Sequence, residues 1–410
     1  MRVLLIHQHY PGQFSHLARA LGPKATVVAI GVGDRSPAEL GPVRYRSHAR
    51  SIGKRSSSGT PSGQLEPEIR NGRTCERQLV ALKGAGFEPH VVIAHPGWGE
   101  TLFLRDVYPE AASIAYLEYF YRKSDSDVDF DPEFPAPSYA LSSVRFRNLP
   151  SLLAFQDADL CITPTAWQAS TFPAPIRNQL RILHDGIDTS AAAPRPAAVA
   201  DIGQRTLTRS DEVITFVSRS LEPYRGFHIL MRALPELLRR RPKAEVVIVG
   251  GDDVSYGAAA GPGATWRQRL LAEVGDSLDM SRVHFLGRIP YASYLALLQV
   301  SRVHVYLTYP FVLSWSLLEA MSTGCAIVAS DTSPVTEVIV DGDNGRLFPF
   351  LDKDRLTALV EELLEDPGQR ERLGRAARET VLERFDFQSR ILPQYVEILE
   401  ERSGMRLSER

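Results

Sequence analysis

The sequence has few cysteines and no long apolar run. Its 410 residues contain 3 cysteines, Cys75, Cys161 and Cys325, and no two of them have the spacing of a zinc-ligand pair. We therefore expect free thiols in a reducing compartment, not a disulfide framework or a zinc knuckle. No apolar segment approaches the length of about 18 residues that a membrane helix requires. The apolar run before His7 has only four residues, which is too short for a secretory signal, so we expect a cytoplasmic protein.

An excess of charge of either sign is also absent. The chain has 47 Lys plus Arg against 49 Asp plus Glu, a formal net charge of −2. Without a basic surplus to neutralise phosphates, nucleic acid is an unlikely class of partner, and we expect none. No amphipathic anchor stands out, although peripheral contact of a basic face with a membrane stays open. The length is sufficient for two to three domains, each with a core of its own.

Short runs rich in Val and Ile alternate with helical patterns along both halves of the chain, which is typical of parallel sheets covered by crossover helices. These runs are continuously apolar, so we expect them to be buried on both faces. The predicted strands are residues 3–6, 26–30, 90–94, 113–117 and 159–163 in the first half, and 213–217, 245–249, 283–286, 303–307 and 326–329 in the second. The sequence therefore predicts an α/β chain with two doubly wound parallel sheets, each binding ligands at the carboxyl ends of its strands.

Two segments interrupt the alternation. Residues 36–72 are rich in Ser, Gly, Pro and Arg, so we expect a long mobile loop there. Residues 191–209 dilute the apolar pattern with Pro and Ala and predict the start of a new domain. We expect residues 1–190 plus about 387–410 to form the first domain and 191–386 the second. The loop contains basic residues that either grip an anionic acceptor or are simply solvated: Arg44, Arg46, Arg50, Lys54 and Arg55.

Three residues of the first half follow predicted strands. Gly12 precedes a predicted helix, where a glycine lets a ligand approach the backbone or serves turn geometry alone. His95 opens the motif HPGWGE and either exchanges protons near neutral pH or is structural; no carboxylate lies at a spacing that would fix its tautomer. Glu118 precedes a segment of aromatic and acidic residues, which either contacts a saccharide acceptor or is an ordinary surface loop.

In the second half, Arg219 and Arg225 flank one turn between a strand and a helix. Two cations in this arrangement suit a diphosphate, whose charge must be neutralised while the bond to it breaks. The alternative is that both arginines lie on the surface and pair with Glu222. Further on, residues 314–316 begin a helix that carries Glu319, a carboxylate able to accept both hydroxyls of a ribose or merely to complement the helix dipole.

Four segments, three in this half and one at the end of the first domain, together resemble the family 4 retaining glycosyltransferases. They are SRSLEPYRG, LLEAMSTGCAIVASD, VTEVIVDGDNGRLF and ILHDGID. The resemblance is dense from about residue 180 to 350 and thin before it. It implies the GT-B fold, in which two Rossmann-like domains face a cleft and the last helix crosses back to the first domain. It also implies transfer of a sugar from a nucleoside diphosphate donor, UDP- or GDP-linked, to an acceptor hydroxyl with retention of configuration. We expect no cofactor and no metal, because arginines can replace the cation.

By position, the resemblance assigns the donor diphosphate to Arg219 and Arg225, and Arg225 stands where the family normally has lysine. It assigns the nucleotide ribose to Glu319, and the diphosphate or donor sugar to the main chain of Ser314, Trp315 and Ser316.

The remaining implied contacts involve three residues. Ile289 lies where the family holds the base by backbone contacts. Gly12 belongs to the loop near the phosphates, and His95 approaches the transferred sugar.

One position departs from the family pattern. The family has two glutamates separated by seven residues, and counting back eight from Glu319 reaches Phe311. This loss implies a different sugar, a substitute carboxylate from elsewhere, or a catalytically silent protein. The sequence thus leaves two alternatives to a transferase: a nucleotide-sugar epimerase of similar two-domain shape, and a silent nucleotide-binding scaffold.

Overall fold

A computed structural model describes residues 1–35, 42–49, 61–135, 138–203 and 205–407. Their contacts divide the chain into two units. Unit 1 comprises Met1–Asp129, Pro135–Gly186 and Phe387–Arg410, and unit 2 comprises Phe130–Phe134 and Ile187–Asp386. The chain thus leaves unit 1 twice, once for a short segment and once for most of its second half.

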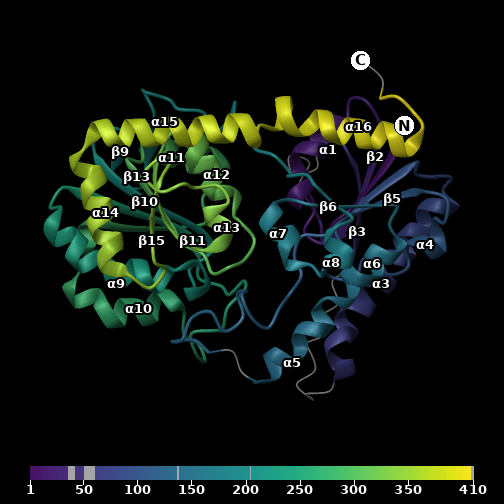
Figure 1. The fold of residues 1–410 in the computed structure, drawn as a ribbon, viewed down its shortest axis with the longest axis horizontal. Helices are drawn as coiled ribbons and strands as arrows, with labels where there is room; N and C mark the ends of the chain where they lie inside the picture. Colours follow the sequence, from purple (N-terminus) through teal and green to yellow (C-terminus); the bar gives the residue numbers. More distant parts are fainter. Residues whose placement is uncertain (36–41, 50–60, 136–137, 204, 408–410) are drawn as a thin grey trace. The chain divides into compact units, whose positions relative to one another are not determined.

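Unit 1 is built on a seven-stranded parallel sheet with the order β3-β2-β1-β4-β5-β6-β7. Figure 1 labels β2, β3, β5 and β6 of this sheet. Alternate residues of a strand face opposite helix layers. In β1, Val3 and Leu5 belong to one hydrophobic cluster and Leu4 and Ile6 to another, which explains why the strand is apolar throughout. The strands are β1 (Arg2–Ile6), β2 (Thr26–Val32), β3 (Arg44–His48), β4 (Val91–Ala94), β5 (Ala112–Tyr116), β6 (Leu160–Thr163) and β7 (Leu180–Ile182).

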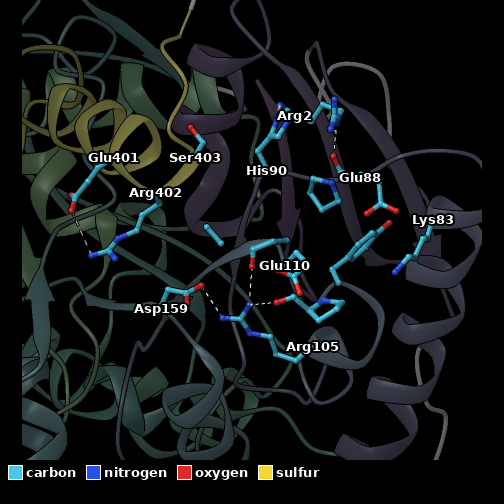
Figure 2. Close-up of a pocket in the computed structure, with 15 residues that line it drawn as sticks. Arg2, Lys83, Glu88, His90, Arg105, Glu110, Asp159, Glu401, Arg402 and Ser403 are labelled. Carbon is cyan, nitrogen blue, oxygen red and sulfur yellow. Dashed lines mark hydrogen bonds and ion pairs between the residues drawn. The ribbon is translucent and has the colours of Figure 1, made fainter.

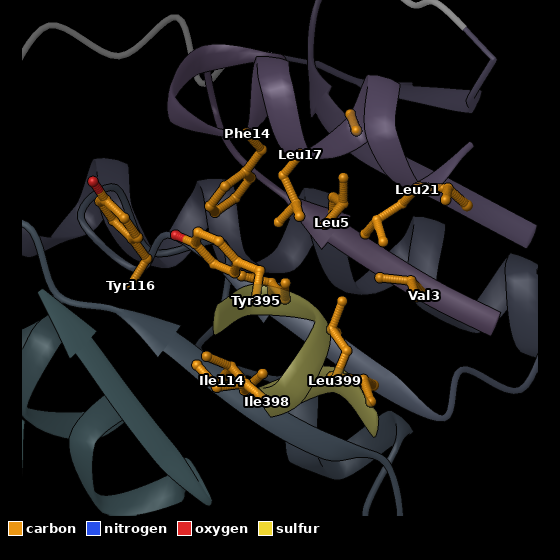
Figure 3. Close-up of a cluster of buried hydrophobic side chains, with 14 of the residues drawn as sticks. Val3, Leu5, Phe14, Leu17, Leu21, Ile114, Tyr116, Tyr395, Ile398 and Leu399 are labelled. Atoms are coloured by element: carbon orange, nitrogen blue, oxygen red, sulfur yellow. The ribbon is translucent and has the colours of Figure 1, made fainter. Parts of the chain in front are cut away.

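The first and the last α-helix of the chain, α1 (Ser15–Leu21) and α16 (Leu392–Ser403), cover one face of this sheet. Figure 3 shows Phe14 and Leu17 meeting Tyr395 and Leu399 of the last helix over β1. The other face is covered by α3 and α4. The helical elements of unit 1 are η1 (Gly12–Phe14), α1 (Ser15–Leu21), α3 (Pro61–Gly84), α4 (Leu104–Val107), α5 (Ser138–Arg147), α6 (Leu149–Asp157), α7 (Ala166–Thr171), α8 (Ala174–Arg177), η5 (Phe387–Ile391) and α16 (Leu392–Ser403).

Unit 2 contains a six-stranded parallel sheet with the order β12-β11-β10-β13-β14-β15 and a separate antiparallel pair, β8-β9. Its strands are β8 (Val199–Asp201), β9 (Thr206–Thr208), β10 (Glu212–Ser220), β11 (Ala244–Gly251), β12 (Val283–Gly287), β13 (Val303–Tyr306), β14 (Ala326–Ser330) and β15 (Arg346–Phe348). Its helical elements are η2 (Pro223–Arg225), α9 (Phe227–Arg240), α10 (Trp266–Val274), η3 (Gly275–Ser277), η4 (Met280–Arg282), α11 (Tyr291–Val300), α12 (Trp315–Ser322), α13 (Ser333–Thr336), α14 (Lys353–Glu365) and α15 (Pro367–Arg384).

Each parallel sheet has one point at which its strand order reverses. In unit 1 this point lies between β1 and β4, and in unit 2 it lies between β10 and β13. Doubly wound sheets bind ligands beyond the carboxyl ends of the strands at such a point. The topology therefore directs attention to the loops after β1 and β4 and to those after β10 and β13.

The prediction of a long loop over residues 36–72 is wrong in part. Arg44–His48 form β3, and α3 already begins at Pro61. The strand is a mostly exposed edge strand and the helix is polar, so neither has the apolar pattern by which buried elements are recognised. Arg44 and Arg46 are exposed on β3, whereas Arg50, Lys54 and Arg55 lie outside the described residues.

Other short elements were also missed. These are β7, β15 and the β8-β9 pair, all of three residues, which are too short to show a period. The unit boundary falls after Gly186, slightly before the expected residue 191, and the return to unit 1 occurs at Phe387. The largest difference is that Phe130–Phe134, expected in the first domain, belong to unit 2. All three cysteines are free and buried.

Candidate functional site

In unit 1, polar side chains follow three neighbouring strands. β1 leads into His7, β4 leads into His95, and Glu118 lies just beyond β5. These strands are adjacent in the sheet, and parallel strands end at the same edge, so the three side chains converge. Two of these residues, His95 and Glu118, were predicted from the sequence, and the structure brings them together.

The ring of His95 is held in one orientation. Its Nδ1 accepts a hydrogen bond of 3.1 Å from the backbone N–H of Gly97, which places the ring proton on Nε2. Nε2 faces Oε2 of Glu118 at 3.4 Å. The ring also stacks on Trp98, with centroids 4.5 Å apart. The carboxylate that faces His95 is therefore Glu118, which comes from the next strand of the sheet. The sequence singled out both residues but not the contact between them.

A second histidine reaches the same carboxylate through an amide. Nδ1 of His7 accepts the backbone N–H of His9 at 3.0 Å, so its Nε2 donates to Oε1 of Gln13 at 2.6 Å. The amide nitrogen of Gln13 in turn donates to Oε1 of Glu118. A Cβ on Gly12 would lie 2.4 Å from Cε1 of His7, and its φ is +45°, so only glycine fits here. Gly12 thus makes room for the His7 ring.

Glu118 is the centre of this network, since one oxygen faces His95 and the other accepts from Gln13. Its side chain is 20% exposed, against 5% for His95, so it is more open to a ligand than the histidine that it faces. Together with the His95 ring that stacks on Trp98, this carboxylate suits the hydroxyls of a sugar. His7 and Gln13 were not singled out from the sequence; their only signal was a polar motif, HQHYPGQF, after a buried strand.

In unit 2, the predicted diphosphate cation Arg225 is buried at the end of the turn after β10. Its guanidinium donates to Oγ1 of Thr308 at 2.6 Å and to the carbonyl oxygen of Val312 at 3.1 Å. The rings of Tyr256 and Phe311 lie 5.3 and 5.8 Å from the guanidinium carbon. The loop after β13 therefore holds the cation that the turn after β10 supplies.

The charge of Arg225 is maintained in spite of burial. Burial opposes the charged form, but the surrounding tyrosines and the carboxylate of Glu222 keep its pKa above the ordinary value. Arg219, in contrast, is exposed on β10. The two predicted cations therefore differ in environment, and Arg225 is the preorganised one.

Glu222 does not form the surface ion pair that was the alternative to a diphosphate site. It is fully buried and accepts backbone N–H groups from Ser255, Tyr256 and Gly257, at 3.3, 3.1 and 3.0 Å. Burial raises the pKa of Glu222. Its role in this structure is to anchor the loop after β11, which carries Tyr256 over Arg225.

The predicted ribose ligand, Glu319, lies in α12 and is buried. Its two oxygens accept hydrogen bonds of 2.7 Å from the hydroxyls of Tyr291 and Tyr294. Burial raises the pKa of Glu319 above its ordinary value, and these two hydrogen bonds offset only part of that rise. Tyr291 is 51% exposed, so a ligand would reach the carboxylate from the side of the oxygen that Tyr291 binds.

Replacing Glu319 by Gln removes the charge and keeps the shape. We expect the variant to bind UDP or GDP roughly 10- to 100-fold more weakly, the loss typical of a buried hydrogen bond to a charged group. Calorimetry measures the affinity and thermal unfolding measures the fold, with the exposed Glu379→Gln on α15 as a control. An unchanged affinity in Glu319→Gln would remove this residue from the nucleotide site.

The start of α12 is partly occupied by its own contacts. Ser314 caps the helix by accepting the N–H of Ser316, and its own N–H donates to the hydroxyl of Tyr306 at 2.9 Å. Trp315 is the first residue of the helix. The backbone of Ser314 is thus already engaged, which the sequence did not reveal.

Two further predicted positions have apolar surroundings. Ile289 follows β12 and packs against two hydrophobic clusters, both of which include side chains of α11. Phe311 is buried against Tyr224 and Tyr256, with ring centroids 5.3 and 5.1 Å away. Phe311 therefore fills an aromatic cluster beside Arg225, where a carboxylate would be buried next to that cation.

The acidic pair after β11 is engaged in ion pairs. Asp252 binds Arg267 and Asp253 binds Arg288. Within the part of the chain that the structure describes, no group of three or more His, Cys, Asp or Glu side chains could hold a metal ion. None of the described helices combines the length and apolar character needed to cross a membrane.

A hollow of about 870 Å³ lies at the opposite edge of the unit 1 sheet, beside the amino ends of β1, β4 and β5 (Figure 2). Its cations have structural partners. Arg105 donates to three backbone carbonyls and to Asp159, and Lys83 donates to a backbone carbonyl at 2.6 Å. The hollow therefore offers an anion few free donors, and we do not assign the reaction to it.

Comparison with known proteins accounts for most of the chain. The family model "Glycosyl transferase family 4 group" matches residues 23–192, and "Glycosyl transferases group 1" matches residues 200–380. The chain belongs to the family 4 glycosyltransferases. The resemblance seen in the sequence is thereby confirmed, and it extends into the first half, where the motifs were thin.

A curated relative is the phosphatidyl-myo-inositol mannosyltransferase of Mycolicibacterium smegmatis. It is 30% identical over 224 residues, which are 54% of this chain and 51% of that protein. The chain thus spans about half the length of the curated relative that it matches.

Solved structures share the whole architecture. Sucrose-phosphate synthase from Thermosynechococcus elongatus matches with a TM-score of 0.75 at 18% identity, over 98% of both chains. HepE from Anabaena, solved in complex with UDP-glucose, matches with a TM-score of 0.70 at 18% identity, over 98% of this chain and 100% of that one. The family 4 chain therefore has the GT-B fold, as predicted.

Proposed function

We propose that this chain transfers a sugar from a nucleoside diphosphate sugar to an acceptor hydroxyl with retention of anomeric configuration. The observation that carries the proposal is Arg225, a buried cation held by Thr308 and Val312 at the point where the strand order of unit 2 reverses. A leaving diphosphate needs a preorganised positive charge of this kind.

On the donor side, Arg225 and Arg219 neutralise the diphosphate as the bond from the sugar to it breaks. Glu319 binds the ribose, and the backbone near Ile289 holds the base. The start of α12, from Ser314 to Ser316, binds the diphosphate or the donor sugar, for which the N–H groups of Ser314 and Ser316 give up their present hydroxyl partners. Both arginines supply charge without a resident metal, so the proposal requires none.

On the acceptor side, Glu118 binds a hydroxyl group of the acceptor. His95, whose ring stacks on Trp98, approaches the transferred sugar. The acceptor oxygen forms its bond to the anomeric carbon on the face from which the diphosphate leaves. A phosphate oxygen of the leaving group takes the proton of the acceptor hydroxyl, so atoms and charge balance without a protein base. The protein acts by positioning and by electrostatics.

The names of the similar proteins support particular classes of donor and acceptor. One relative is named for a mannosyl transfer to phosphatidyl-myo-inositol, which supports a glycolipid acceptor. A similar structure was solved with UDP-glucose, which supports a UDP-linked donor. Saccharides and small-molecule glycosides as acceptors, and GDP-linked donors, belong to the same proposal.

The test is a panel of UDP- and GDP-sugars assayed for released nucleoside diphosphate, with and without acceptor glycosides. We expect one donor to turn over faster with an acceptor and to give a product of unchanged anomeric configuration, which NMR identifies. Inverted configuration would contradict retention. Conversion of the donor to another sugar nucleotide without acceptor would identify an epimerase, and binding without any turnover would identify a scaffold.

A further inference from the structure

A short segment of the chain, Phe130–Phe134, leaves unit 1 and packs into unit 2. Its two aromatic ends are inserted among aromatic side chains. The ring of Phe130 lies 5.1 Å from that of Tyr309, and the ring of Phe134 lies 5.1 Å from that of Trp266. Between them, Glu133 forms a two-pronged ion pair with Arg232, at 2.6 and 2.7 Å. The 130–134 segment is therefore an integral part of unit 2.

Asp131 is the buried polar residue of this segment, with 1% of its surface exposed. Its Oδ2 accepts a hydrogen bond of 2.7 Å from the hydroxyl of Tyr309 and lies 3.1 Å from Nε2 of His228. Its Oδ1 accepts the N–H of Glu133 at 3.0 Å. Burial alone would raise the pKa of Asp131, but these contacts hold it below the ordinary value. The carboxylate is thus charged inside the unit and dependent on its partners.

The residue that Asp131 holds belongs to the loop that holds Arg225. Tyr309 stands between Thr308 and Val312, which supply the two oxygen atoms bound by the Arg225 guanidinium. The N–H of Tyr309 also donates to the carbonyl oxygen of Tyr224 at 3.1 Å, one residue before Arg225. A displacement of Tyr309 would therefore disturb both the oxygen atoms that bind the Arg225 guanidinium and the backbone next to Arg225.

We propose that Asp131 is a positioning residue for the donor diphosphate: by binding the Tyr309 hydroxyl, it fixes the loop after β13 and, through it, Arg225. This inference rests on the proposed function, which gives Arg225 its role. It also bears on the carboxylate missing at Phe311. Because Asp131 is almost inaccessible, it supports the site from behind and does not substitute for a carboxylate that touches the donor sugar.

Asp131→Asn removes the charge of the acceptor in this hydrogen bond, and Tyr309→Phe removes the hydroxyl that donates it. Both substitutions nearly preserve the shape of the side chain. We expect both to raise the Kd for UDP or GDP by about tenfold, as for one buried hydrogen bond to a charged group, and the double variant to be no weaker than the single ones. Glu133→Gln is the matched control, because it weakens the docking of the same segment through Arg232 and leaves Tyr309 untouched. It should bind nucleotide as the unaltered protein does.

Hydrogen exchange of the loop amides gives a readout that needs no nucleotide. Asp131→Asn should speed exchange in residues 307–313, and Glu133→Gln should not. If the unaltered protein binds nucleotide, then equal affinities in Asp131→Asn and Glu133→Gln, or unchanged exchange in the loop, would overturn the positioning role alone. If the unaltered protein binds neither UDP nor GDP, the proposed function fails, and this inference fails with it.

Discussion

Arg225→Ala should lower turnover by about 2 to 4 kcal/mol of transition-state stabilisation, or about thirtyfold to a thousandfold. The reason is that Arg225 is buried and already oriented by Thr308 and Val312, so its charge costs little reorganisation when the diphosphate leaves. Arg219→Ala carries the same prediction, and because Arg219 is exposed its loss should leave the fold intact. Steady-state rates with the donor found in the panel measure both effects.

Arg225→Lys separates charge from geometry. Lysine keeps the charge but lacks the planar guanidinium, whose Nη1 donates to both Thr308 and Val312, so we expect an intermediate rate. The exposed Arg239→Ala on α9 serves as a control, since Arg239 is paired with Glu236 on the surface of the same helix. Unchanged turnover in both Arg219→Ala and Arg225→Ala would remove these residues from the mechanism.

Glu100→Gln should change the pH dependence of stability. Glu100 is the last residue of the HPGWGE motif, with 1% of its surface exposed, and Nε2 of His48 is 3.9 Å from its carboxylate. Burial raises the pKa of Glu100 to about 8 from an ordinary 4.5. The residue is therefore protonated in the folded protein at neutral pH.

The direction of the effect follows from this shift. Between pH 4.5 and about 8 the folded state holds a proton that the unfolded state has lost. The stabilisation is complete below the unfolded pKa and is lost as the pH rises through this range, by on the order of 3 kcal/mol between pH 4.5 and 7. A glutamine is neutral in both states and removes this loss.

Denaturant unfolding of both proteins from pH 5 to pH 8 measures the effect. The other titrating groups contribute alike to both, so the difference between them isolates Glu100. We expect Glu100→Gln to gain stability relative to the unaltered protein as the pH rises, whereas Glu66→Gln, on an exposed residue of α3, should not. A difference that stays constant with pH would show that Glu100 is already ionised in the fold.

Much of each parallel sheet could be predicted from the sequence, because strands buried on both faces must be apolar throughout. This holds for β1 and β14, whose residues are almost all buried. The edge strand β3 and the polar helix α3 escaped the same reasoning because solvent contact relaxes that requirement. The predicted loop over residues 36–72 was wrong for this reason.

The candidate site could be predicted only as positions in loops. Arg225 and Glu319 could be proposed because a strand end and a helix start give each a local context. Their partners were not found, because Thr308 is 83 residues from Arg225 and Tyr291 is 28 residues from Glu319. The same holds for Glu118, whose contact with His95 depends on β5 lying beside β4.

The sequence by itself determined the class of fold and the family, and it pointed to the loops in which we propose the chemistry, because burial pattern and strand-end motifs are local properties of the chain. Only the tertiary structure decided which side chains meet. It joined His7, Gln13 and His95 to Glu118, and it placed Asp131 beneath the loop of Tyr309. Such contacts are set by strand order and by the path of the chain between the units, and a linear pattern of residues carries neither.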